Sequence, residues 1–196
     1  MMIIVCVLSL LFLLGCSSPQ ARLEKLTTND VEYEAEYTAV FSDAYYSENM
    51  WLKFYEKGEN RRIDVQSEEF AVTALDVGMD HFRCYFEGTG FECEVPDTPH
   101  PFNFEPTGLD FYTVAELSSR NVLGEKTECF ELIEKEGNPL RSRGYDAPPP
   151  TEICYLDGVL AYMSGPTSDE VFVQIKADRI RFQVDDSVFN IVPGFQ

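Results

Sequence analysis

The sequence predicts a single-domain, mainly β protein of the α+β class. The clearest observation is the stretch from Val31 to Ser42, where apolar side chains alternate with Glu and Thr, as in a strand with one buried and one solvated face. About ten segments of strand character are separated by turn residues, and no internal repeat is present. Helical patterns are confined to two or three short stretches, so strands should form the body of the fold.

Two short helices are predicted. The first begins at Ser18-Pro19, where Ser can cap the helix and Pro can take its first position, and it should end near residues 27–30. The second covers Leu109 to Ser119, where the apolar residues are only loosely periodic.

The remaining strands follow from apolar runs and the turns between them. Residues 50–66 predict two strands hinged at Lys57-Gly58-Glu59-Asn60, and Asp157-Gly158 predicts the turn of a hairpin over 152–163. Residues 171–184 predict either one long strand or two. Further strands are predicted at 70–76 and 127–133.

The hairpin over 81–94 can be assigned a register. If Gly88-Thr89 form a two-residue turn, Glu87 pairs with Gly90, and Cys84 then faces Cys93 at a non-hydrogen-bonded position. Such pairs bring their Cα atoms to about 4.5 Å, which a disulfide tolerates. The sequence therefore predicts a Cys84–Cys93 disulfide, which leaves Cys129 to pair with Cys154.

Two proline-rich stretches, 95–107 and 138–151, cannot be central strands. We interpret the first as a loop that covers part of the sheet and the second as a long irregular connection.

Composition excludes several functions. The formal net charge is −19, so the surface should repel nucleic acid and anionic lipid headgroups. Only two histidines are present, and no catalytic, phosphate-binding or metal-binding motif was found. We therefore expect no enzyme activity, no cofactor and no metal site.

The first sixteen residues form an almost uninterrupted apolar run, which ends in Leu13-Leu14-Gly15-Cys16. This run is shorter than the approximately 20 residues of a membrane-spanning helix and has the length of a secretory signal. Its end resembles the lipobox of prokaryotic lipoproteins, which implies cleavage before Cys16 and lipid attachment there. The expected organisation is a signal peptide over 1–15, a lipidated tether with a short helix over 16–30, and a β-rich domain over 31–196. The protein is then expected to be exported and anchored to a membrane, facing the periplasm or cell exterior.

The order of four stretches resembles the LolA/LolB lipoprotein-carrier fold of bacterial and archaeal lipoproteins. They are Val31 to Phe41, Trp51-Leu52-Lys53 with Arg61-Arg62-Ile63-Asp64, the two cysteine segments at 129–131 and 154–159, and Phe189 to Pro193. The resemblance implies a curved antiparallel half-barrel around an apolar hollow, covered by two or three short helices and by loops.

The same resemblance implies a binding protein for a hydrophobic or acyl ligand, or for a lipoprotein in transit. The ligand contacts that it suggests are Trp51, Phe54, Arg61 and Arg62, and it does not decide which arginine corresponds to that of the family. The alternative is a cell-surface interaction module without a small-molecule ligand, which would contact its partner through the proline-rich loops.

Overall fold

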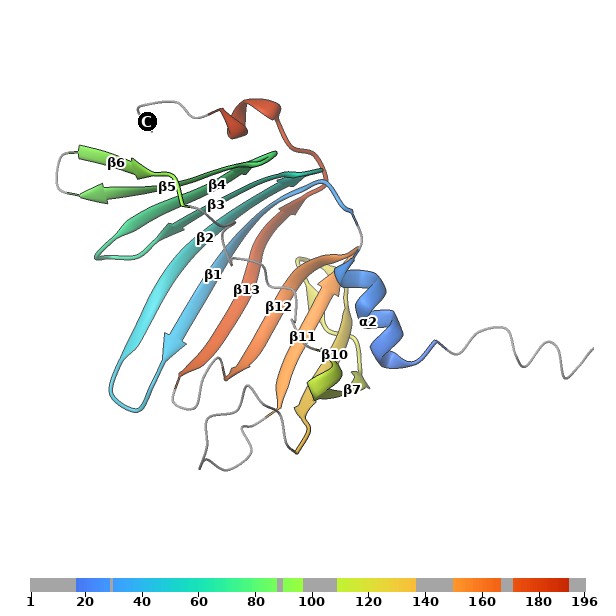
Figure 1. Cartoon of the computed structure of the whole chain (residues 1–196). Coiled ribbons are helices and arrows are strands. Elements are labelled where there is room, and N and C mark those ends of the chain that lie inside the picture. Colours follow the sequence, from blue (N-terminus) through green and yellow to red (C-terminus); the bar gives the residue numbers. More distant parts are fainter. Residues whose placement is uncertain are drawn as a thin grey trace, which may run out of the picture.

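The computed structural model describes residues 17–28, 30–87, 90–96, 109–136, 150–166 and 171–190. Its main element is an antiparallel sheet of eleven strands in the order β6-β5-β4-β3-β2-β1-β13-β12-β11-β10-β7. The sheet is strongly curved (Figure 1). One half runs from β6 to β1, and the other continues from β13 to β7. The predicted fold class and the single curved sheet are therefore confirmed.

Nearly every strand in this sheet pairs with its neighbour in sequence, and β1 with β13 joins the two halves. The strands are β1 (Tyr33–Ser42), β2 (Ser47–Lys57), β3 (Asn60–Gln66), β4 (Ala71–Val77), β5 (Asp80–Glu87), β6 (Gly90–Glu94), β7 (Tyr112–Leu117), β10 (Glu128–Glu134), β11 (Thr151–Leu156), β12 (Val159–Pro166) and β13 (Phe172–Arg181). A separate small hairpin contains β8 (Asn121–Val122) and β9 (Glu125–Lys126).

Helix α2 (Pro19–Thr27) begins as predicted. The Ser18 hydroxyl accepts a hydrogen bond from the backbone N–H of Ala21 at 3.2 Å, and Pro19 occupies the first helical position. Leu23 is fully buried against the β10–β12 part of the sheet, so this helix is part of the folded domain.

The residues that face α2 form what we call the inner face of the sheet. On a flat sheet β1 and β11, which have β13 and β12 between them, would lie about 14 Å apart. Tyr155 on β11 nevertheless contributes to the raised pKa of Tyr33 and of Tyr37 on β1, which indicates that the sheet curls toward this face and brings these side chains closer together. The inner face is therefore the concave one.

The opposite, outer face is covered at two places. The 3-10 turn η2 (Asp186–Phe189) packs through Phe189 against Tyr55 and Leu75, and the β8–β9 hairpin contributes Val122 to a second cluster. These two short segments explain why the outer face also has buried apolar side chains.

Both predicted disulfides are present, and both lie on the outer face. Glu87 pairs with Gly90 and Cys84 with Cys93, in the predicted register, with 4.0 Å between the cysteine Cα atoms. Cys129 on β10 faces Cys154 on β11, with 4.1 Å between their Cα atoms. Each disulfide joins neighbouring strands.

The prediction of a helix over Leu109 to Ser119 is wrong. Only the 3-10 turn η1 (Leu109–Phe111) is helical, and residues from Tyr112 onward form β7, which pairs with β10. Tyr112 and Val114 pack toward α2, while Thr113 between them is exposed. The side chains therefore alternate between the two faces with the period of two that is typical of a strand. In the described residues, α2 and two 3-10 turns replace the expected two or three covering helices.

Other expectations are resolved or fall outside the described residues. Residues 171–184 contain a single strand, β13, and the turn at Asp157-Gly158 has positive φ angles of 49° and 89°. Cys16, most of the two proline-rich stretches and the last six residues lie outside the described part.

Candidate ligand-binding face

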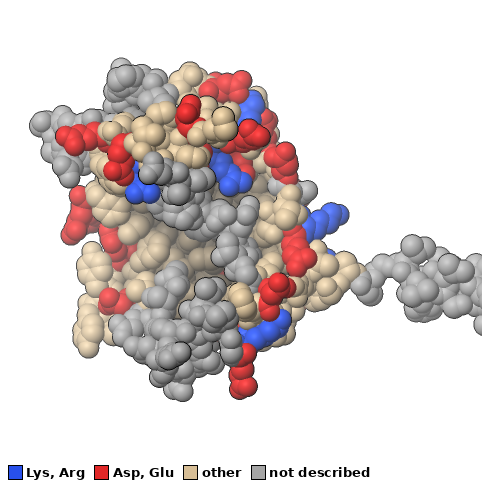
Figure 2. Space-filling model, viewed as in Figure 1, with Lys and Arg blue, Asp and Glu red and all other residues tan. Residues whose placement is uncertain are grey.

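The inner face is lined by apolar side chains in its middle part, from β3 across to β10. β1 contributes small residues at Ala35 and Ala39, which let the larger side chains of neighbouring strands approach. The buried apolar residues of the inner face on the other strands include Leu52, Phe54, Ile63, Val173, Ile175, Phe130, Leu132, Ile153 and Leu160. In the space-filling view, charged side chains lie mainly around the periphery of the described surface (Figure 2).

Three tyrosines, Tyr33, Tyr37 and Tyr155, contribute hydroxyl groups to this apolar face. Tyr37 is 1% exposed, and burial raises its pKa well above the usual value, with further contributions from Tyr33 and Tyr155. Burial and the charge of Glu56 likewise raise the pKa of Tyr33. The hydroxyls of Tyr33 and Tyr37 therefore remain protonated at neutral pH.

A polar row crosses one end of the inner face. Its members pair in register on five consecutive strands, and they are Tyr33, Glu56, Arg61, Asp76 and His81. Nη2 of Arg61 lies 2.8 Å from Oε1 of Glu56, and Nδ1 of His81 lies 2.9 Å from Oδ1 of Asp76. The inner face thus combines an apolar surface with a charged row at one end.

The four suggested ligand contacts divide between the two faces. Phe54 lies on the inner face, 7% exposed, with its ring edge-on to Tyr37 at 5.5 Å between centroids. Arg61 also lies there, with its side chain 43% exposed. Trp51 lies on the outer face, because it pairs with Thr38, one residue out of phase with Tyr37.

Arg62 lies on the outer face as well, where it holds η2. Its guanidinium donates through Nη1 to the carbonyl oxygen of Val188 at 2.9 Å and through Nε to Asp64 at 3.0 Å, and it lies over the ring of Tyr55. Arg62 therefore holds η2 against the outer face, whereas Arg61 faces the concave side.

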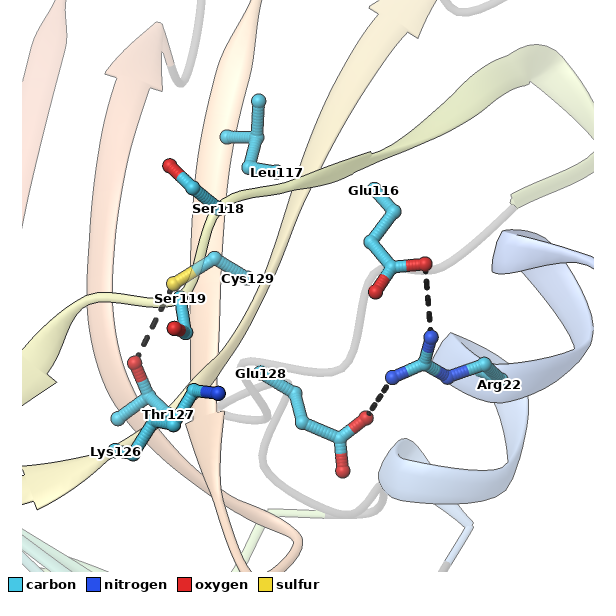
Figure 3. A pocket seen from close by; sticks show the side chains of 9 residues that line it. All are labelled: Arg22, Glu116, Leu117, Ser118, Ser119, Lys126, Thr127, Glu128 and Cys129. Carbon is cyan, nitrogen blue, oxygen red and sulfur yellow. Dashed lines mark hydrogen bonds and ion pairs between the residues drawn. The ribbon is translucent and has the colours of Figure 1, made fainter.

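A separate pocket of about 380 Å³ lies where α2 meets β7, β9 and β10. Figure 3 shows Arg22 of α2 between Glu116 and Glu128, at 2.8 Å and 2.5 Å. Its other lining residues are Leu117, Ser118, Ser119, Lys126, Thr127 and Cys129. The mixed charges suit an apolar chain poorly, and the ion pairs fix α2 against the sheet.

In the described part of the chain, the group of potential metal ligands found is Cys129, Glu152 and Cys154. Its two sulfur atoms form a disulfide with each other, so this group is not a metal site. No helix in the described residues is both long and apolar enough to cross a membrane.

Sequence reasoning missed several residues of the inner face, including Tyr155 and Glu56. The register of the β1–β2 hairpin could have placed Glu56 beside Tyr33. Nothing in the sequence alone indicates that Tyr155 approaches β1, because that proximity depends on the curvature of the sheet.

No protein-family model and no curated protein sequence matches the chain. Solved structures do match its fold. One is MucB of Pseudomonas aeruginosa in its complex with MucA, with a TM-score of 0.57, 10% identity, and coverage of 90% of this chain and 62% of that one. The chain thus spans less than two thirds of MucB.

Two further structures match over nearly their whole length. An uncharacterized conserved protein of Thermus thermophilus gives a TM-score of 0.51 with 10% identity, and 89% of this chain and 92% of that one are covered. The lipoprotein LppX of Mycobacterium tuberculosis gives 0.50 with 8% identity and coverage of 85% and 95%. At these identities the likeness shows a shared fold.

Proposed function

We propose that this protein is exported, anchored through lipid on Cys16, and holds a hydrophobic or acyl ligand, or the acyl part of a lipoprotein, on its inner face. The observation that carries the proposal is the concave apolar face with its polar row at one end. An acyl ligand has the same division into a long apolar part and a short polar part. The fold shared with the lipoprotein LppX supports the same interpretation.

The two neighbouring arginines take different parts in this proposal. Arg61 contacts the polar end of the ligand, because it faces the concave side and remains 43% exposed beside Glu56. Arg62 keeps η2 on the outer face and does not contact the ligand. Of the two arginines suggested by the resemblance to the lipoprotein-carrier fold, we therefore assign Arg61 to the ligand.

This pair supplies a matched test of binding. The mature chain is titrated with a fluorescent fatty acid, and Arg61→Gln is compared with Arg62→Gln. We expect several-fold weaker binding for Arg61→Gln, because a charge-assisted hydrogen bond to the carboxylate is lost, and unchanged binding for folded Arg62→Gln. Equal affinities in both variants and the parent would contradict the assignment of Arg61.

The anchor requires its own test. Cys16→Ser should abolish acyl labelling and release the protein from membranes, since the thiol that carries the lipid is removed. Membrane retention and continued acyl labelling of Cys16→Ser would overturn the anchor. A surface interaction module remains the second candidate, favoured by the exposed aromatic side chains Tyr45, Tyr46 and Trp51.

A further inference from the structure

Exposed aromatic side chains gather at the end of the sheet opposite the polar row. We call this region the distal rim and define it as residues 43–51 and 67–70 together with Phe172. It includes the turn between β1 and β2 and the turn between β3 and β4. Five of the large apolar residues that are exposed in the described structure lie here: Tyr45, Tyr46, Trp51, Phe70 and Phe172.

Strand pairing brings these segments together. Ser42 at the end of β1 pairs with Ser47 on one side and with Phe172 on the other. Trp51 pairs with Gln66, which immediately precedes the β3–β4 turn. In Figure 1 the β1–β2 hairpin tip and the start of β13 lie at the same lower end of the sheet. The aromatic residues therefore belong to one continuous end of the molecule.

The distal rim is also strongly acidic. It contains Asp43, Glu48, Glu68 and Glu69, and no Lys or Arg is present in its segments. Asp43 has a structural task, since its carboxylate accepts hydrogen bonds at 2.7 Å from the backbone N–H groups of Tyr45 and Tyr46. The other three have no ion pair within the described residues, and they raise the pKa of Tyr46, Glu48 most strongly.

This combination limits what can bind. Exposed aromatic residues are enriched at protein interfaces, where they supply most of the binding energy. Four carboxylates on segments that contain no Lys or Arg repel anionic lipid and would also repel the same surface on a second copy of this chain. They attract Lys and Arg side chains, and Arg additionally stacks on aromatic rings.

We propose that the distal rim is a docking surface for a partner polypeptide segment that carries Lys or Arg side chains interspersed with apolar ones. The apolar side chains contact Tyr45, Trp51 and Phe172, and the cations pair with Glu48, Glu68 and Glu69. This surface lies at the other end of the sheet from Arg61, so it is independent of the proposed ligand site.

The test measures binding of a fluorescent peptide of repeating Arg-Leu-Gly to the mature full chain in detergent, with a Glu-Leu-Gly peptide for comparison. The charge variant is Glu68→Lys/Glu69→Lys. Its matched control is Asp80→Lys/Glu125→Lys, which makes the same change in net charge at exposed positions outside the distal rim. Tyr45→Ala tests the aromatic contribution, because a 99% exposed side chain can be removed without unfolding the protein.

We expect the rim variant to lose about tenfold or more in affinity for the cationic peptide, and the control to lose about twofold or less. Tyr45→Ala should weaken binding several-fold. An equal loss in the rim and control variants would show attraction by net charge alone and overturn the proposal. Equal binding of the Glu-Leu-Gly peptide would overturn it as well. So would preferential binding of neutral or anionic lipid vesicles through the same residues, which would make the surface a membrane contact.

Discussion

Trp51 and Phe54 lie on the same strand, β2, and point to opposite faces of the sheet. Phe54 packs edge-on against Tyr37 in the core of the inner face, whereas Trp51 is 39% exposed and pairs with Gln66, the last residue of β3. Their spacing of three residues makes this arrangement unavoidable in a regular strand. Residues that the sequence suggested as one ligand site therefore serve the proposed ligand face and the proposed docking surface separately.

Replacing these two residues should affect stability very differently. Phe54→Ala removes a buried ring and leaves a cavity, so we expect the free energy of unfolding to fall by about 3–5 kcal/mol. Trp51→Ala removes a partly exposed ring and should cost about 1 kcal/mol or less. Urea denaturation of both variants measures the difference, and similar losses would show that β2 does not have the side-chain orientation described.

Helix α2 should be held mainly by its buried leucine. Leu23→Ala should lower the free energy of unfolding by about 2–5 kcal/mol, because Leu23 is fully buried against Phe130 and Leu160. Arg22→Ala should have a smaller effect that shrinks further in high salt, since Arg22 is partly exposed between its two glutamates.

Denaturant curves at low and high salt separate these two contributions to α2. Lys25→Ala serves as the control, because Lys25 is exposed on the same helix. A Leu23→Ala protein as stable as the parent would mean that α2 does not pack on the sheet in solution.

The two disulfides should differ in their response to reductant. Cys93 is exposed, whereas Cys129 and Cys154 are 2% and 0% exposed. A mild thiol reductant should therefore open Cys84–Cys93 first. Alkylation followed by mass analysis identifies the order. Free Cys129 thiols appearing before free Cys84 thiols would contradict the described burial.

Removing each disulfide should also cost different amounts of stability. On chain-entropy grounds, replacing Cys129 and Cys154 by Ala should cost about 3.5 kcal/mol, and the shorter Cys84–Cys93 loop about 2.5 kcal/mol. Both values refer to the oxidised parent measured without reductant.

Stability should decline in alkaline solution because of the buried tyrosines. Burial raises the pKa of Tyr37 and of Tyr33 in the folded state, so both remain protonated there while the unfolded chain ionises above about pH 10. The folded state then binds more protons, and the free energy of unfolding decreases as pH rises above about 10, by up to about 1.4 kcal/mol per pH unit for each tyrosine.

Denaturation of Tyr37→Phe between pH 8 and pH 11.5 measures this dependence. The variant should show a shallower decline than the parent, and Tyr45→Phe, whose ring is almost fully exposed, should follow the parent. An unchanged slope in Tyr37→Phe would mean that its hydroxyl ionises freely in the folded protein.

The local pairings could be predicted from sequence, because turn residues set the register of a hairpin. A two-residue connection between Glu87 and Gly90 predicts Cys84 opposite Cys93, and the Asp157-Gly158 turn predicts the β11–β12 hairpin. The order of β1 and β13 in the middle of the sheet could not be obtained this way, since they are joined by no turn and lie far apart in the sequence.

The segment from Tyr112 to Leu117 shows why some elements were assigned wrongly. It is short, and its apolar spacing fits either period loosely, so pairing with β10 decides its structure. The ligand-facing arginine was undecided for a related reason. Arg61 and Arg62 are adjacent, and only the register with Glu56 and Tyr55 on β2 shows which one faces inward.

Native mass spectrometry decides whether the inner face holds a hydrophobic ligand. The mature chain is purified from an exporting host, and its mass under native conditions is compared with its mass after denaturation. The denatured mass should equal that of the chain with its two disulfides formed. We expect an additional, non-covalently bound mass of a lipid or acyl molecule, which is lost on denaturation and is less abundant in Arg61→Gln. A native mass equal to that of the bare protein, also after incubation with fatty acids and phospholipids, would contradict it.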